Sequence, residues 1–564
     1  MKISFIQSSS ELEHIKKLLG QLPTIVPLSL EALIYCDLNK IRYLDPEKII
    51  SHDFYKITNY ECDNYIKKIN FDNVSYDFIK NEIRSIIRFK YYQLAFLIEI
   101  IHSLKKNQKI SEIFVTDMYS SPEYRVMMKY PGNNFTNIDE TLINLFNDLK
   151  VKVLNLNYKK KFTNINSSVS IYETIGIRYK KQKKILFNNS AYNFRRFIIY
   201  LLKNKHKVSI IDEGIPKIKK LIFKVLGIEI IELKKIKSAP IEKKFSLNQK
   251  FYFKNLEITN LINKQLNVSY EYIYDLESKY NALSKVFNLS EIKLVISNSN
   301  RGLGAILIEH AFKNKIKSLM VSHGTIAESF NKNDEIYKKA IAEGVFSGKA
   351  DFHAIQSKIT KNSLKTHNLY GKPIITGNLV FAEKKKFLKN KNFICLYAVT
   401  NKPFPAMQFY GVEMFHEFYN NLKNIEKFSK ENSYIFYIHL HPGAKNSIEL
   451  LKKKFPNLIF KTGKIEKSLK YASVTLSYSS TVIEDSLHSK VPVILFDTKS
   501  RYRHCDSETN SEKKDQSVYY INDYKNLKNC IETIKKSKNI KFEDKIFIEN
   551  SKNNIEKLFP KIIN

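Results

Sequence analysis

Two polar clusters, about forty residues apart, each follow a run of residues that is typical of a buried strand. The first is His441 and Pro442 in YIHLHPG, and the second is Ser479, Ser480 and Thr481 in SYSSTVIEDSL. An imidazole can donate a hydrogen bond to a phosphate oxygen, and the proline would end the strand and direct the imidazole into the following loop. Hydroxyls and N–H groups at a helix start also bind anions. Together the two clusters predict a nucleotide phosphate site.

Glu484 lies one helical turn beyond the second cluster, on a face that could reach the hydroxyls of a ribose. Both clusters also have ordinary structural explanations, which stay open. The histidine could cap a strand end against a backbone carbonyl, and Ser480 or Thr481 could cap the helix while Glu484 closes a capping box. Their occurrence at neighbouring strand ends favours a phosphate site over two unrelated caps.

Two further strand ends carry side chains that could act as a general base. VSIIDEG places Asp212 and Glu213 at the end of a predicted strand, where repulsion between adjacent carboxylates in a cleft would raise one pKa towards neutrality. A solvated turn is the alternative explanation for these residues. LMVSHG places His323 at the end of another strand, directly before a predicted hinge, where it could act as base or bind the acceptor.

Several common nucleotide and metal motifs are absent from the sequence. ISNSNRGLG lacks the third glycine of a dinucleotide fingerprint, and no GxxxxGK[ST] phosphate loop occurs. There is no Asp-x-Asp triplet, no HExxH and no Cys/His cluster with metal-ligand spacing. We therefore expect no metal and no bound cofactor, with the nucleotide donor acting as a co-substrate.

The amino-acid composition indicates the class of protein and the compartment in which it is expected. The 564 residues are 43% hydrophobic, which is typical of a globular protein, and a net charge of +37 favours polyanionic partners unless it reflects composition bias. The scattered cysteines favour a reducing compartment. The run YYQLAFLIEIIHSL is too short for a membrane span and contains Glu99. We expect a cytoplasmic protein whose lysine-rich helices could hold it on the anionic inner-membrane surface.

The elements that must position these residues alternate between short apolar runs and longer amphipathic ones, as in β-α units. Residues 50–110 should be helical, and residues 232–290 should form a helical or irregular insertion. The polar segment NKNDEIYKKA divides two series of strands. The pattern predicts an α/β chain of two Rossmann-like doubly wound domains facing a central cleft, with ligands beyond the strand carboxyl ends. The expected divisions are 1–335, 336–545 and a last helix, 546–564, that packs back across the cleft.

The predicted strands of the first series are TIVPLSL, EIFVTDM, KVLNLNY, KILFNNS, KVSIIDEG, KLVISNS and SLMVSHG. Those of the second series are FHAIQS, PIITGN, FICLYAV, YIFYIHLH, LIFKTG, SVTLSYSS, VPVILFD and SVYYIND.

HLHPG, together with LKYASVTLSYSSTVIEDSLHSKVPVILFD, resembles the His-Pro and Ser-Ser motifs of bacterial surface-polysaccharide glycosyltransferases of the GT-B fold. The similarity covers mainly residues 290–500 and is to enzymes that use cytidine-nucleotide donors. IIDEG is similar to the motif that carries the general base of bacterial sialyltransferases, which implies that role for Asp212 or Glu213. KPIITGN resembles part of the interdomain crossing of surface-carbohydrate proteins, which implies a donor-side role for Gly377 and Asn378.

The resemblance implies a metal-independent transferase that moves a CMP-activated acidic sugar, of sialic acid or Kdo type, onto a surface glycan. Its partners would be a nucleotide-sugar donor and a lipid-linked or nascent glycan acceptor of capsule or lipopolysaccharide synthesis. A transferase using UDP- or GDP-sugars and a CDP-glycerol-type glycerophosphotransferase are alternatives. A basic nucleic-acid-binding protein and a non-catalytic scaffold are others. The lysines are spread over almost every helix and no RNA-binding motif occurs, so we expect no specific nucleic acid.

Overall fold

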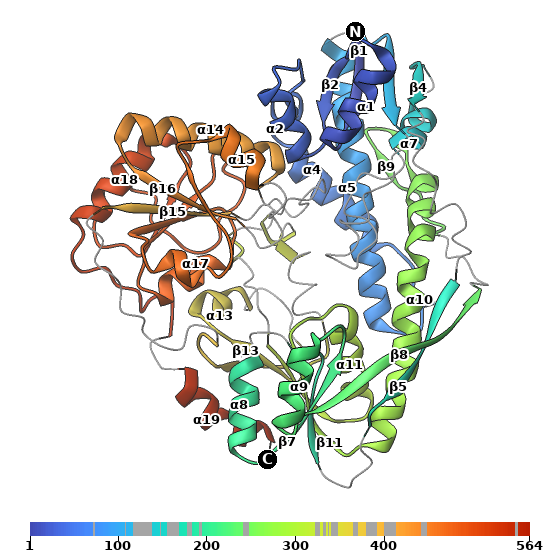
Figure 1. Cartoon of the computed structure of the whole chain (residues 1–564), viewed down its shortest axis with the longest axis vertical. Helices are drawn as coiled ribbons and strands as arrows, with labels where there is room; N and C mark the ends of the chain where they lie inside the picture. The colour runs from blue at the N-terminus through green and yellow to red at the C-terminus, as the bar shows by residue number, and fades with distance from the viewer. Residues whose placement is uncertain are drawn as a thin grey trace.

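In the described residues, the computed structural model contains three large sheets, which lie in three separate parts of the molecule (Figure 1). It also contains a two-stranded antiparallel sheet of β9 (Tyr252–Phe253) and β10 (Leu256–Glu257). An eight-stranded sheet lies at the bottom of this view, a six-stranded sheet at the left and a four-stranded sheet at the top. The structure describes residues 1–71, 74–107, 109–116, 138–146, 148–154, 168–177, 183–190, 194–240, 247–321, 328–330, 334–336, 338–339, 348–364, 370–379, 392–399, 413–440, 448–547 and 551–563.

The eight-stranded sheet is parallel except for its last pair, and its strand order is β14-β13-β12-β11-β6-β7-β8-β5. Its strand order reverses between β6 and β11, because the chain builds β7 and β8 on one side of β6 and returns to place β11 to β14 on the other. The strands are β5 (Ser168–Ile175), β6 (Lys184–Phe187), β7 (Lys207–Asp212), β8 (Glu229–Pro240), β11 (Ile292–Ser297), β12 (Lys317–Met320), β13 (Phe352–Ile355) and β14 (Lys372–Ile375).

Both faces of this sheet are covered by helices, as its continuous apolar strands require. Because strand side chains alternate between faces, Ile185 and Phe187 of β6 join one buried cluster and Leu186 joins another. The first cluster includes side chains of α8 (Arg195–Lys203), α9 (Lys217–Val225) and α19 (Ser551–Ile563). The second includes α10 (Thr259–Leu289) and α11 (Gly302–Lys313).

The six-stranded sheet is wholly parallel, and its strand order is β17-β16-β15-β18-β19-β20. The chain builds outward from β15 through β16 to β17 and then returns to the other side of β15 with β18, so the strand order reverses between β15 and β18. In open α/β sheets, ligands bind beyond the carboxyl ends of the strands at such a reversal. The strands are β15 (Ile394–Ala398), β16 (Ile435–His439), β17 (Ile459–Lys461), β18 (Val474–Ser477), β19 (Val493–Phe496) and β20 (Val518–Ile521).

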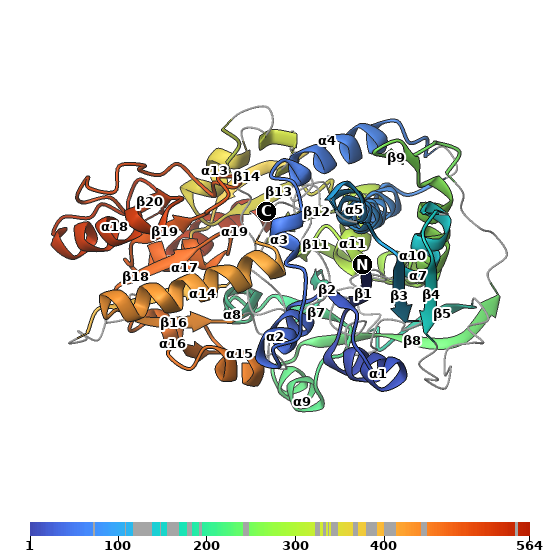
Figure 2. The same ribbon diagram turned by 90° about the horizontal axis from the view of Figure 1, so that it is seen from above.

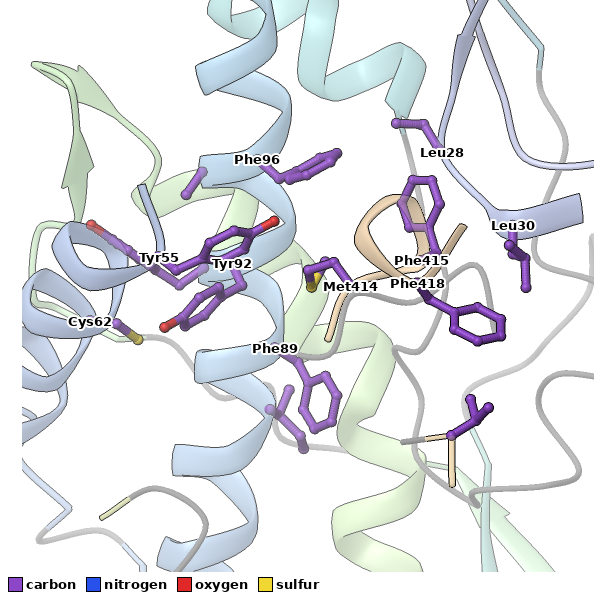
Figure 3. Close-up of a cluster of buried hydrophobic side chains, with 14 of the residues drawn as sticks. Leu28, Leu30, Tyr55, Cys62, Phe89, Tyr92, Phe96, Met414, Phe415 and Phe418 are labelled. Atoms are coloured by element: carbon purple, nitrogen blue, oxygen red, sulfur yellow. The ribbon is translucent and has the colours of Figure 1, made fainter. Parts of the chain in front are cut away.

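The N-terminal sheet, of order β2-β1-β3-β4, is also parallel and was not expected as a separate sheet. The long helix α5 (Asp77–Asn107) lies between β2 and β3 in the sequence. Figure 3 shows its Tyr92 and Phe96 side chains near Met414 and Phe415, at the start of α14 (Phe415–Asn432). The helix α5 also packs against α10 and α11 of the eight-stranded sheet. The strands are β1 (Lys2–Ile6), β2 (Thr24–Pro27), β3 (Glu112–Thr116) and β4 (Val151–Leu154).

The fold class is confirmed, since the chain is α/β with two doubly wound parallel sheets of Rossmann type. The sheets do not divide at residue 335, however. β13 and β14 lie beyond that position and pair with the eight-stranded sheet, which therefore extends to Ile375, and the six-stranded sheet begins at Ile394. Near the end of the chain, α19 returns to the eight-stranded sheet, where the rings of Phe559 and Phe197 lie 5.4 Å apart.

All five cysteines are free and buried. Within the described part of the chain, no helix combines the length and the hydropathy needed to cross a bilayer.

The buried carboxyl group of Glu413 makes stability depend on pH. It is fully buried and accepts hydrogen bonds from the Tyr397 hydroxyl and from the Asn421 amide, the latter at 2.8 Å. Burial raises its pKa from 4.5 to about 7. The folded protein therefore binds this proton more tightly than the unfolded chain does. The contribution to stability is full below the ordinary pKa and is lost as pH rises through about 7.

We expect Glu413→Gln, which stays neutral, to gain stability relative to the native protein as the pH is raised from 5 to 8. The pKa difference sets an upper size of about 3 kcal/mol for this relative gain. Thermal unfolding of both proteins across this range measures it, with the exposed Glu512→Gln as control. A constant difference in melting temperature between native and variant proteins would contradict the prediction.

Candidate functional site at two neighbouring sheet edges

The turn after β18 lies at the reversal of strand order in the six-stranded sheet. The Ser477 hydroxyl donates to the Ala398 carbonyl of β15 at 3.1 Å and accepts from the Ser480 N–H at 3.3 Å. These bonds fix the turn between the carboxyl ends of the two strands that flank the reversal. The structure therefore places Ser479, Ser480 and Thr481 where a sheet of this kind binds its ligand.

The three predicted hydroxyl groups of this turn are in different situations. The Ser480 hydroxyl accepts from the Val482 N–H at 3.3 Å and so performs a local capping role. The Thr481 side chain is exposed and makes no cap hydrogen bond to the short helix α17 (Val482–His488). Ser479 is half-buried. Thr481 is thus the hydroxyl of this turn whose replacement disturbs the local structure least.

The Glu484 carboxylate joins the two large sheets. It is buried and accepts hydrogen bonds from the hydroxyls of Ser357 and Thr360, the second at 3.2 Å. Both hydroxyls lie around the start of α13 (Lys358–Leu364), which follows β13 of the eight-stranded sheet. Glu484 therefore holds α17 against α13 and does not close a capping box, while its predicted contact with a ribose stays a prediction.

Asn378, another predicted donor-side residue, reaches the same helix from the end of β14. Its amide donates to Asp485 at 3.4 Å, and the preceding Gly377 has φ of +65°. Burial, reinforced by repulsion from Glu484, raises the pKa of Asp485 well above its ordinary value. The carboxyl ends of β13 and β14 thus contact the helix that begins at the end of β18, and the two sheets meet at this edge.

His441, Pro442 and His323 lie outside the described residues. The strands that precede them are described. β16 ends at His439, next to β15, and β12 ends at Met320, next to β13. His439, the last residue of β16, was not predicted as a site residue. It is buried, and its ring nitrogens lie 2.8 Å from the Ser468 hydroxyl and 3.2 Å from the Gly463 carbonyl.

The carboxylates of the IIDEG segment are both paired. Asp212 forms an ion pair with Lys220 and accepts from the N–H groups of Gly214 and Ile215, at 2.8 and 2.6 Å. Burial alone would raise the pKa of Asp212, but Lys220 and these N–H groups outweigh it and hold the pKa below its ordinary value. Glu213 lies 3.8 Å from the Lys279 ammonium.

The sequence led us to expect a raised pKa for one of these two carboxylates, and Asp212 is not that one. The two carboxylates also lie apart from the meeting edge. β7 stands four strand positions from β13, about 19 Å at ~4.8 Å per strand. The strand before His323, by contrast, is the immediate neighbour of β13.

A second polar cluster, which we did not predict, lies where the strand order of the eight-stranded sheet reverses. The amides of Asn188 and Asn189, after β6, donate to the Asn298 side chain, after β11, at 2.9 and 3.1 Å. The asparagines in KILFNNS and VISNSN could have revealed it, because both motifs follow predicted strands. Among the described residues, no group of three or more His, Cys, Asp or Glu side chains could hold a metal ion.

Comparison with known proteins gives a similarity in structure only. No protein-family model and no curated protein matches the chain. UDP-GlcNAc 2-epimerase from Methanocaldococcus jannaschii is 15% identical over 67% of this chain and all of its own, with a TM-score of 0.38. The Neisseria meningitidis UDP-GlcNAc 2-epimerase bound to UDP-GlcNAc is 14% identical over 68% and 99%, with a TM-score of 0.36.

A third solved structure, the wall teichoic acid polymerase TagF, is 12% identical over 68% of this chain and 89% of its own, with a TM-score of 0.36. Similarity at this level does not extend to function, so the function has to be argued from the site.

Proposed function

We propose that the chain is a glycosyltransferase that binds a nucleotide-sugar donor at the carboxyl edge of the six-stranded sheet. The single observation that carries the proposal is the position of the Ser479–Thr481 turn at the reversal between β15 and β18. This turn begins the helix that contacts the ends of β13 and β14. A donor held there lies beside the other large sheet, which is then available to the acceptor.

The donor phosphate would be bound by the hydroxyls of Ser479 and Thr481 and by His441. Hydroxyl and N–H donors can hold a phosphate without a metal ion. We infer a CMP-activated acidic sugar from the sequence motifs, and a surface glycan, lipid-linked or nascent, as the acceptor. Of the predicted bases, His323 is now preferred to Asp212, because it follows the strand next to β13 and Asp212 is held by Lys220.

Thermal stabilisation by nucleotides tests the proposal. CMP is expected to raise the melting temperature of the native protein more than CDP, UDP or GDP does. Thr481→Val, which removes one hydroxyl from a charged phosphate, should weaken nucleotide binding by about 10- to 100-fold. The exposed Thr462, after β17, is three strand positions from β18 and provides the matched control Thr462→Val.

The outcomes separate the alternatives. Stabilisation by UDP but not by CMP would exclude the cytidine donor and leave a UDP-sugar transferase. Stabilisation by CDP-glycerol above CMP would favour glycerophosphotransfer. No response to any nucleotide, with salt-dependent retention of RNA, would overturn the proposal in favour of nucleic-acid binding.

A further inference from the structure

The helix α9 exposes an unusually apolar face. Its sequence KIKKLIFKV is followed by Leu226, and five large aliphatic side chains spaced at one helical face are open to solvent. Scattered exposed aliphatic residues are normal in a soluble protein, but a contiguous group on one element marks an interaction site. The exposed fractions are 78% for Ile218, 64% for Leu221, 52% for Ile222, 80% for Val225 and 50% for Leu226.

The opposite side of α9 fixes the helix to the eight-stranded sheet. Phe223 is buried in the cluster beneath α8, and Lys219 donates to the Ser190 carbonyl at 2.7 Å. Lys220 pairs with Asp212 at the end of β7. These contacts hold the helix in place, so its apolar face is a fixed outer surface of the molecule, and Figure 2 shows α9 at the edge of the view.

Two exposed lysines of the helix flank this apolar face. Lys217 and Lys224 of the helix are exposed, and residues 217–225 contain no carboxylate. The following strand β8 carries Glu232, which pairs with Lys220 of the helix, and further along the exposed Lys234, Lys235 and Lys237. Aliphatic side chains on one face with lysines beside them are typical of helices that lie in the headgroup region of a membrane. The charge selects an anionic bilayer.

We propose that α9 docks the protein onto an anionic lipid bilayer, with its five aliphatic side chains in the headgroup–acyl boundary and its lysines against lipid phosphates. Because Phe223 fixes the other side of α9 to the eight-stranded sheet, this contact turns the α9-covered face of that sheet towards the bilayer. The inference concerns a surface outside the donor site and does not depend on which nucleotide binds there.

Sedimentation with lipid vesicles tests the docking surface. At low salt the native protein should bind vesicles of phosphatidylglycerol and phosphatidylcholine, and should bind pure phosphatidylcholine far less. The double variant Leu221→Gln/Val225→Gln should lower the partition coefficient between vesicles and water by about tenfold or more, because each side chain loses apolar area that the bilayer would bury. Lys217→Gln with Lys224→Gln should lower it by about fivefold per lysine on anionic vesicles only.

A matched control uses α4 (Phe54–Lys67), which lies at the opposite edge of the view in Figure 2. Its Ile57 and Tyr60 are 47% and 55% exposed, and replacing both by glutamine should leave vesicle binding unchanged. Unchanged binding of the Leu221/Val225 variant would overturn the proposal, as would no binding by the native protein. A native dimer that this variant dissociates would assign the face to a second copy of the chain instead.

Discussion

His323→Ala is expected to lower turnover by about 10²- to 10⁴-fold while nucleotide binding stays intact, which is the loss that follows removal of a general base. β12, the strand before this histidine, pairs with β13, and the turn after β13 carries the Ser357 hydroxyl that bonds to Glu484. The carboxyl end of β12 therefore lies beside the strand whose following turn contacts the six-stranded sheet. The measurement is the steady-state turnover number. The donor is the nucleotide-sugar that contains the nucleotide found to stabilise the protein.

Asp212→Asn is the matched comparison, because asparagine keeps an oxygen that can accept from the N–H groups of Gly214 and Ile215. It removes the charge that pairs with Lys220 and should change turnover less than about tenfold. Glu213→Gln completes the series. A large loss in either carboxylate variant, with normal turnover after His323→Ala, would return the base to the IIDEG segment. A pH–rate profile that loses its acidic limb only in His323→Ala would identify the imidazole directly.

Glu484→Ala is expected to destabilise the protein by about 2–4 kcal/mol, because it leaves the buried hydroxyls of Ser357 and Thr360 without this acceptor. Urea unfolding measures the loss. Glu484→Gln keeps one accepting oxygen in the same place and should lose clearly less. Both variants leave the Ser479–Thr481 turn unchanged in sequence.

The same two variants distinguish the structural role of Glu484 from a ribose contact. If the carboxylate only joins α17 to α13, nucleotide affinity should fall little once both proteins are compared below their unfolding range. Normal stability of Glu484→Ala together with loss of nucleotide binding would instead support the ribose contact and contradict the interface role.

Most of the strands could be predicted, because a parallel strand buried on both faces is a short apolar run with polar residues at its end. KILFNNS, KVSIIDEG and VPVILFD all became strands of the two large sheets. β5 and the end of β8 could not be recognised in this way. They form an antiparallel pair at the edge of a sheet, and β8 ends in the lysine-rich sequence ELKKIKSAP, which has no apolar run.

The position of the candidate turn could be predicted, but the contacts of the candidate residues could not. A turn at the end of an apolar run is visible in sequence, and Ser479 to Thr481 do lie at such an end. The partner of a carboxylate is not visible, since it depends on elements far along the chain. Glu484 bonds to hydroxyls 124 and 127 residues away. Lys220, only eight positions from Asp212, is one of many lysines, and nothing in the sequence singles it out as a partner.

The long helix α5 has a mechanical consequence. Its 31 residues span about 46 Å, and its Glu82 accepts from the Gly302 N–H of α11, which covers the eight-stranded sheet, at 2.7 Å. Nearer its other end, Phe96 stacks on His416 of α14, with ring centroids 6.3 Å apart. Two domains joined only by a linker can open and close freely. Here α5 contacts helices that pack on both large sheets, and so it restricts their relative motion. If the two large sheets move towards each other on a substrate, α5 must bend or its contacts must slide. We therefore expect small shear displacements and no wide hinge motion.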